Sequence, residues 1–157
     1  MARFRYSMQS ILDIKLKMET QAKQEFSAAR AALDREEEKL ALLFDRKRGY
    51  EVKAGELLAG TLDIQEIEEN QAAILSMDRF IADQRIRVAA AERNLERARE
   101  QLTEVMKERK THENLKEKAF DQFLVEENRR EGKEIDELTS YVYGKRRREN
   151  DRSGAPA

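Results

Sequence analysis

The chain has 157 residues, 31 of them basic and 32 acidic, which gives a formal net charge of −1. This balance argues against a nucleic-acid-binding protein, and the lack of cysteine excludes disulfides and thiol chemistry. No apolar run reaches the 18 residues that a membrane-spanning helix needs, and 40% charged residues without tryptophan are typical of a coiled coil rather than a globular core.

The first predicted element is a helix over residues 4–58, because apolar side chains recur along it every 3.5 residues on average. From residue 26 onward this heptad stripe consists of Phe26, Ala29, Leu33, Glu36, Leu40, Leu43, Lys47, Tyr50, Ala54 and Leu57. Upstream it consists of Phe4, Met8, Ile11, Lys15, Met18 and Ala22. An additional four-residue step joins the two stretches, so we expect a stutter that locally unwinds the supercoil.

Residues 59–63 are expected to form a turn. Gly60 suits the position just after a helix end, and Asp63 suits the cap of the next helix, with Glu66 reaching back to it. Leu62 and Ile67 then stand at the positions of a hydrophobic staple. These signals predict that the first helix stops here and a second one starts.

The second predicted helix covers residues 64–143 and has the most regular heptads of the chain. One series is Ile67, Ile74, Ile81, Val88, Leu95 and Leu102, and the interleaved series is Asn70, Met77, Gln84, Ala91, Ala98 and Val105. After residue 105 the seam positions become Arg109, His112 and Lys116. Two long helices joined by a short turn predict an all-α fold, a long antiparallel two-helix coiled-coil hairpin.

The turn position also predicts which residues face each other. Paired residues have numbers that sum to about 123 if both helices rise equally, so Phe26 faces Leu95. Residues from about 120 to 143 then extend past the start of the first helix as a C-terminal helical overhang, whose apolar side chains need another surface. We expect residues 1–144 to form a single domain and residues 145–157 to form a disordered basic tail.

Patterns for catalysis and metal binding are lacking in the sequence. His112 is the only histidine and stands on the seam, where it is expected to be a packed spacer. No glycine-rich phosphate loop and no nucleophile–base set can be assembled. We therefore expect no enzymatic activity, no cofactor and no metal site. The basic residues 145–148 could contact acidic partners, lipids or RNA, but the acidic Glu149 and Asp151 that follow favour a solvated tail.

Three large apolar residues stand beside the seam rather than on it: Leu42, Phe44 and Phe80. A minimal two-helix interface does not require them. Two interpretations remain open, a broadened seam and an exposed contact patch near the turn.

Residues 4–15, with the sequence FRYSMQSILDIK, resemble the N-terminus of the flagellar export protein FliJ family. In that family an aromatic residue precedes a Leu-Gln-Ser-Leu-Leu-like run and a charged helix, and residues 19–26 fit this continuation. Residues 126–138 resemble the charged segment near the family's C-terminus. The likeness extends over nearly the whole chain in length and layout.

This resemblance implies a cytoplasmic, non-enzymatic stalk of the flagellar type III export apparatus, peripherally associated with the inner membrane through its partners. The open end of such a hairpin inserts into the hexameric export ATPase FliI, and the side near the turn contacts the export-gate protein FlhA. Some members also handle export chaperones. Mapped onto this chain, the ATPase-binding residues are Phe4, Met8, Ile11, Phe123, Leu124, Ile135 and Leu138. The gate-binding residues are Leu43, Tyr50, Met77 and Phe80.

Arg46 and Ala73 stand where the gate-contacting surface is expected to carry larger aromatic residues, so the match there is partial. Two other functions stay open at this stage. One is the corresponding stalk of a virulence type III secretion system, which has the same architecture and different partners. The other is a self-associating coiled-coil scaffold in which the overhang forms a dimer.

Overall fold

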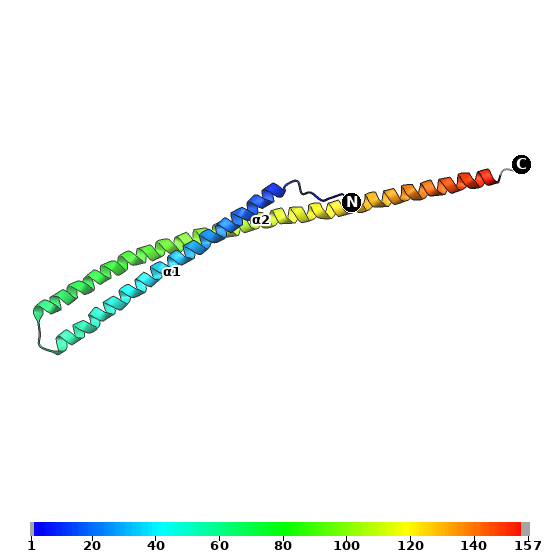
Figure 1. The fold of residues 1–157 in the computed structure, drawn as a ribbon. Helices are drawn as coiled ribbons and strands as arrows, with labels where there is room; N and C mark the ends of the chain where they lie inside the picture. Colours follow the sequence, from blue (N-terminus) through cyan, green and yellow to red (C-terminus); the bar gives the residue numbers. More distant parts are fainter. Residues whose placement is uncertain (1, 155–157) are drawn as a thin grey trace. The chain divides into compact units, whose positions relative to one another are not determined.

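The computed structural model describes residues 2–154, which form two long helices and no strand. Helix α1 spans Gln9–Ala59 and helix α2 spans Ile64–Ser153 (Figure 1). The chain divides into two compact units: residues 15–107 form one, and residues 1–14 together with 108–157 form the other. Neither helix is apolar over a length that would cross a bilayer, as far as the described residues go. The expectation of one domain over residues 1–144 stays a prediction.

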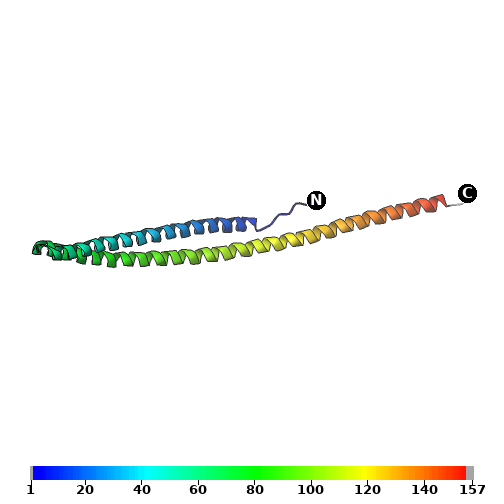
Figure 2. The same ribbon diagram turned by 90° about the horizontal axis from the view of Figure 1, so that it is seen from below.

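Within residues 15–107, α1 and α2 lie side by side and run antiparallel (Figures 1 and 2). The predicted helical hairpin is therefore confirmed. Its best-packed part contains Leu33, Ala91 and Leu95, with Phe26, Ala29 and Val88 packed against them. Phe26 thus lies in the cluster that contains Leu95, as the predicted pairing requires.

The predicted seam of α1 is confirmed from Phe26 to Leu57, because each of its ten heptad positions is buried or half-buried. The predicted stutter is wrong. Met18 is exposed, whereas Glu19 is only 6% exposed and stands between the buried Leu12 and Ala22. Positions 12, 15, 19, 22 and 26 continue the heptad without an additional step. The spacing of the apolar residues Met8 and Ile11 pointed to Met18 rather than to the neighbouring Glu19.

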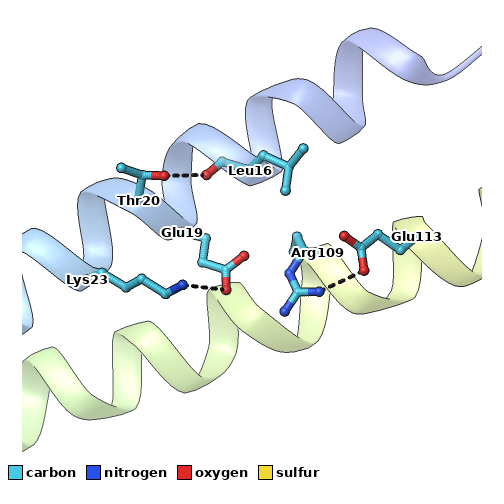
Figure 3. Close-up of polar contacts among 6 residues, drawn as sticks. All are labelled: Leu16, Glu19, Thr20, Lys23, Arg109 and Glu113. Atoms are coloured by element: carbon cyan, nitrogen blue, oxygen red, sulfur yellow. Dashed lines mark hydrogen bonds and ion pairs between the residues drawn. The ribbon is translucent and has the colours of Figure 1, made fainter.

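Glu19 occupies this position with its carboxylate held in an ion pair. Its carboxylate forms an ion pair of 3.6 Å with Lys23, one turn later on α1 (Figure 3). Thr20 beside it donates a hydrogen bond of 3.1 Å to the carbonyl oxygen of Leu16. The stem of a long charged side chain can pack on apolar surface while its head remains paired or solvated.

The turn between the helices follows its local signals. Asp63 caps α2, since its Oδ1 atom accepts hydrogen bonds from the backbone N–H groups of Gln65, at 3.0 Å, and Glu66, at 3.4 Å. The backbone N–H of Ile67 then donates to the carbonyl oxygen of Asp63. Gly60 does not adopt a left-handed conformation, because no glycine in the described range has a positive φ.

In the second unit, α1 begins at Gln9 rather than at the predicted residue 4. Residues 2–6 have no regular structure, and the N–H of Gln9 donates to the carbonyl oxygen of Tyr6 across the turn before the helix. An extended segment advances about 3.3 Å per residue, whereas a helix advances about 1.5 Å. The N-terminal residues therefore reach further along α2 than a helix would.

The predicted C-terminal overhang is present, but both of its bounds differ from the prediction, the first because of this reach. Phe120 and Phe123 contact Phe4, and the continuous exposed stretch of α2 starts only at Asn128. At the other end α2 continues to Ser153, ten residues beyond the predicted Tyr143. Residues 145–153 of the predicted disordered tail are thus helical, whereas residues 155–157 lie outside the described range.

Candidate interaction surfaces

Three phenylalanines hold the N-terminal segment against α2. The rings of Phe4 and Phe120 are 5.2 Å apart at 71°, an edge-to-face contact, and the rings of Phe4 and Phe123 are 5.4 Å apart. Phe120 and Phe123 stack at 6.4 Å. Such pairs contribute about 0.5–1.5 kcal/mol each beyond their buried area. Of the three, Phe120 is 41% exposed, so the cluster still offers apolar surface.

Beside this cluster lies a shallow groove with cationic walls. It is lined by Arg3, Phe4, Arg5, Tyr6, Gln9 and Lys116. Sequence reasoning did not anticipate this groove. The residue numbers of Arg5 and Lys116 nevertheless sum to 121, close to the sum that the predicted pairing of the helices requires. The pattern was hidden because basic residues occur throughout the chain.

The C-terminal overhang, residues 128–153, is the most accessible part of this unit. Every residue from Asn128 to Gly154 is exposed, and Figures 1 and 2 show this stretch as one continuous helix, orange to red. It nevertheless carries large apolar side chains: Ile135, Leu138, Tyr141, Val142 and Tyr143. Large apolar side chains that stay exposed side by side are typical of a surface that contacts a partner.

The residues predicted to bind the ATPase fall into two groups. Phe4 and Phe123 are half-buried in the aromatic cluster, where they hold the N-terminal segment on α2 and offer little surface to a partner. The exposed members are Met8, Ile11, Leu124, Ile135 and Leu138. Of these, Ile135 and Leu138 are more than 60% exposed and are therefore the clearest candidates for contact with a partner. Their predicted role stays untested.

The residues predicted to bind the export gate differ in accessibility. Met77 is 9% exposed and belongs to the seam, and Leu43 and Tyr50 are half-buried. Phe80 on α2 is 53% exposed, and Leu42 on α1 is 55% exposed. A partner can therefore reach Phe80 directly, whereas Met77 is occupied by the hairpin itself.

Sequence reasoning missed two further exposed residues near the turn. Leu75 and Ile86 are 62% and 66% exposed, and their separation of eleven residues, three helical turns, puts them on one face of α2. The sequence could have indicated their exposure, since neither Leu75 nor Ile86 stands at a heptad position of the predicted seam. Phe44, by contrast, is half-buried, and the guanidinium of Arg85 lies 5.5 Å from its ring centre, a cation–π contact.

Polar contacts also cross the hairpin. The side-chain amide of Gln84 donates to the carbonyl oxygen of Glu36, at 2.9 Å, and to its carboxylate. This second hydrogen bond lowers the pKa of the Glu36 carboxyl, against a smaller opposing effect of desolvation. Lys47 and Asp78 form an ion pair of 2.7 Å, whose hydrogen bond raises the pKa of the Lys47 ammonium.

On α2, Arg109 donates to the carboxylate of Glu113 at 2.7 Å (Figure 3). His112 is half-buried, and its Nδ1 atom makes no hydrogen bond within the described structure. No cluster of three acidic or histidine side chains that could hold a metal occurs among residues 2–154.

Comparison with known proteins places this arrangement in a family. The family model for the flagellar FliJ protein matches residues 4–148. The chain belongs to the flagellar FliJ family. Membership supports a stalk-like component of a type III export apparatus and agrees with the resemblance seen at residues 4–15. The FliJ match includes the aromatic cluster and most of the C-terminal overhang.

A solved structure with a similar fold is that of CT670 from Chlamydia trachomatis, described as a YscO homologue. The two chains are 24% identical, with a TM-score of 0.73, over 93% of this chain and 99% of CT670. This similarity shows that the long hairpin is a fold shared with a solved protein. No curated protein matches the chain.

Proposed function

We propose that this FliJ-family chain is a non-enzymatic stalk of the flagellar type III export apparatus. Its open end, with the N-terminal segment and the C-terminal overhang, seats in the hexameric export ATPase FliI. The side of the hairpin near the turn contacts the gate protein FlhA, which keeps the chain on the cytoplasmic side of the inner membrane. The observation that carries the proposal is the family match over residues 4–148.

The exposed overhang supports the ATPase contact. Residues 128–153 form a helix about 39 Å long, with exposed Ile135 and Leu138 and without cover from their own unit. Seating in a ring of subunits would remove this apolar surface from water, which stabilises the assembly by about 25 cal/mol per Å² buried. A stiff helix in a ring can also bias the conformation of the subunits it contacts.

The gate contact is supported by the apolar residues left exposed near the turn. Phe80 supplies a large aromatic surface, a residue type enriched at the energetic centres of interfaces. Met77 acts indirectly in this proposal, since it packs in the seam beneath. The chain thereby couples ATPase and gate by binding both, without chemistry of its own. Escort of export chaperones is an additional role that family membership suggests.

The ATPase contact can be tested with purified FliI and full-length variants. Replacing Ile135 and Leu138 by serine removes the apolar face, and we expect the stimulation of ATP hydrolysis to need at least about five times more stalk protein, as for a loss of about 1 kcal/mol. The matched control replaces Lys133 and Arg147 by serine, since both are exposed and lie on the other side of α2. Unchanged stimulation by the first variant would refute the proposed seat.

The structural similarity to CT670 favours a second candidate, the stalk of a virulence type III secretion system, because CT670 is described as a YscO homologue. The two functions differ in their ATPase. Affinity capture from the native cell extract decides between them: recovery of the flagellar enzyme supports the proposal, and recovery of the secretion-system enzyme supports the alternative.

A further inference from the structure

One face of the C-terminal overhang carries charges in a self-complementary order. Its heptad positions, with Glu127 just before the overhang, are Glu127, Glu131, Glu134, Leu138, Tyr141, Lys145, Arg148 and Arg152. The steps between them alternate between four and three residues, so these side chains lie along one side of α2. Read from either end, the stripe has three charges of one sign, two apolar residues, and three charges of the other sign.

This order fits an antiparallel partner with the same sequence. When Leu138 of one chain lies opposite Tyr141 of another, Glu134 meets Lys145 and Glu131 meets Arg148. At the outer ends Glu127 meets Arg152. Twofold symmetry repeats each pair, as expected for the interface of a symmetric dimer. In a parallel pair every charge would meet its own copy, which is destabilising.

The surface is free to make this contact. Residues 131–152 are all exposed, and none of the charged residues of the stripe within that range forms an ion pair in the described structure. Glu127 is partly covered and pairs with Arg130 at 3.3 Å. Such a neighbouring pair on one helix contributes only about 0.3–0.5 kcal/mol, so it is easily exchanged.

We propose that the C-terminal overhang binds a second copy of this chain, as an antiparallel helix pair centred between Leu138 and Tyr141. Three acidic and three basic positions make a lipid or nucleic-acid surface a poor match, since half of the stripe would be repelled by phosphates. A second copy satisfies all six charges and also covers the apolar centre. The inference does not depend on the export function, but the dimer would cover Leu138 and so exclude the proposed ATPase contact.

The test uses full-length variants in which the four inner charges of the stripe, at positions 131, 134, 145 and 148, have one sign only. Glu131→Arg/Glu134→Arg makes these four positions basic, and Lys145→Glu/Arg148→Glu makes them acidic. We expect each variant alone to stay at the 18.4 kDa mass of one chain at protein concentrations where the wild type shifts toward twice that mass in sedimentation. An equimolar mixture of the two variants should regain the two-chain mass, because both halves of the stripe become complementary again.

The matched control is Lys133→Glu/Arg147→Glu, which changes net charge as much as the acidic variant but lies on the other side of α2. It should dimerise like the wild type. A wild type that keeps the one-chain mass throughout the concentration series at low salt overturns the inference. So does a mixture of the two variants that fails to associate, or a control that loses the dimer. Helix content measured by circular dichroism verifies that every variant is folded.

Discussion

Gln84 of α2 donates a hydrogen bond of 2.9 Å to the backbone carbonyl oxygen of Glu36 on α1. Two heptads closer to the hairpin turn, Asn70 donates a hydrogen bond of 3.0 Å to the carbonyl oxygen of Tyr50. Both amides are 5% exposed and both bonds join residues whose numbers sum to 120. A buried polar residue in a coiled-coil seam specifies the register, since a shift would leave it without a partner. These two hydrogen bonds therefore specify the register in which α1 and α2 pair.

Replacing Gln84 by alanine should lower the free energy of unfolding by about 1–2 kcal/mol, the range for a buried hydrogen bond with loss of its donor. Gln101→Ala is the control, because Gln101 is exposed on the same helix and undergoes the same change in helix propensity. Urea denaturation followed by circular dichroism measures both. Equal effects of the two substitutions would mean that the crossing bond does not stabilise the hairpin.

The Gln84 amide also makes stability depend on pH. It lowers the pKa of the Glu36 carboxyl in the folded state below the unfolded value of about 4.3. The resulting stabilisation is fully present above that unfolded value and is lost as the pH falls through the folded pKa. The difference in unfolding free energy between wild type and Glu36→Gln should thus shrink in acid. In a Gln84→Ala background this pH dependence should be weaker, and an unchanged dependence would contradict the assignment.

Leu33 tests the packed centre of the hairpin. It contacts Ala91 and Leu95 and is 9% exposed, so Leu33→Ala should cost about 2–4 kcal/mol through lost burial and a cavity. Leu42→Ala is the control, since Leu42 is 55% exposed on the same helix, and we expect a change below about 0.5 kcal/mol. A cost at Leu42 comparable to that at Leu33 would indicate that the solvent-facing side of α1 is packed in solution.

Phe80 tests the proposed gate contact. Phe80→Ala removes an aromatic ring that is 53% exposed, so we expect binding to FlhA to weaken at least about five-fold while the melting temperature stays unchanged. Met77→Ala should instead lower the melting temperature, because Met77 packs in the seam. Titration calorimetry and thermal melts separate the two effects. Wild-type affinity of Phe80→Ala would remove Phe80 from the gate surface.

The hairpin could be predicted because the same pattern of apolar residues repeats along both helices. Apolar positions such as Leu33 and Leu95 recur at heptad spacing, and the capping signal at Asp63 locates the turn. Exceptions came from single side chains: Glu19 occupies a seam position that periodicity assigned to Met18. Periodicity treats a glutamate as polar, whereas its stem can pack and its charge can pair with Lys23.

The candidate surfaces were less predictable at the chain ends. The helix over residues 4–8 was inferred from apolar spacing, but residues 4–6 have no regular structure, residues 7 and 8 form a turn, and Phe4 packs on Phe120. Its reach along α2 depends on backbone conformation, which apolar spacing alone does not reveal. The burial of Met77 follows from its predicted seam position, whereas packing decides whether Phe80 broadens the seam or stays exposed.

In the proposed function, the C-terminal overhang seats in the export ATPase. A photo-crosslinking amino acid at position 138, introduced into the full-length chain in the native cell, tests it most directly, with position 80 as the comparison. We expect a covalent product with FliI from position 138 and none with FliI from position 80. A product with FliI from position 80 but not from position 138 would contradict it.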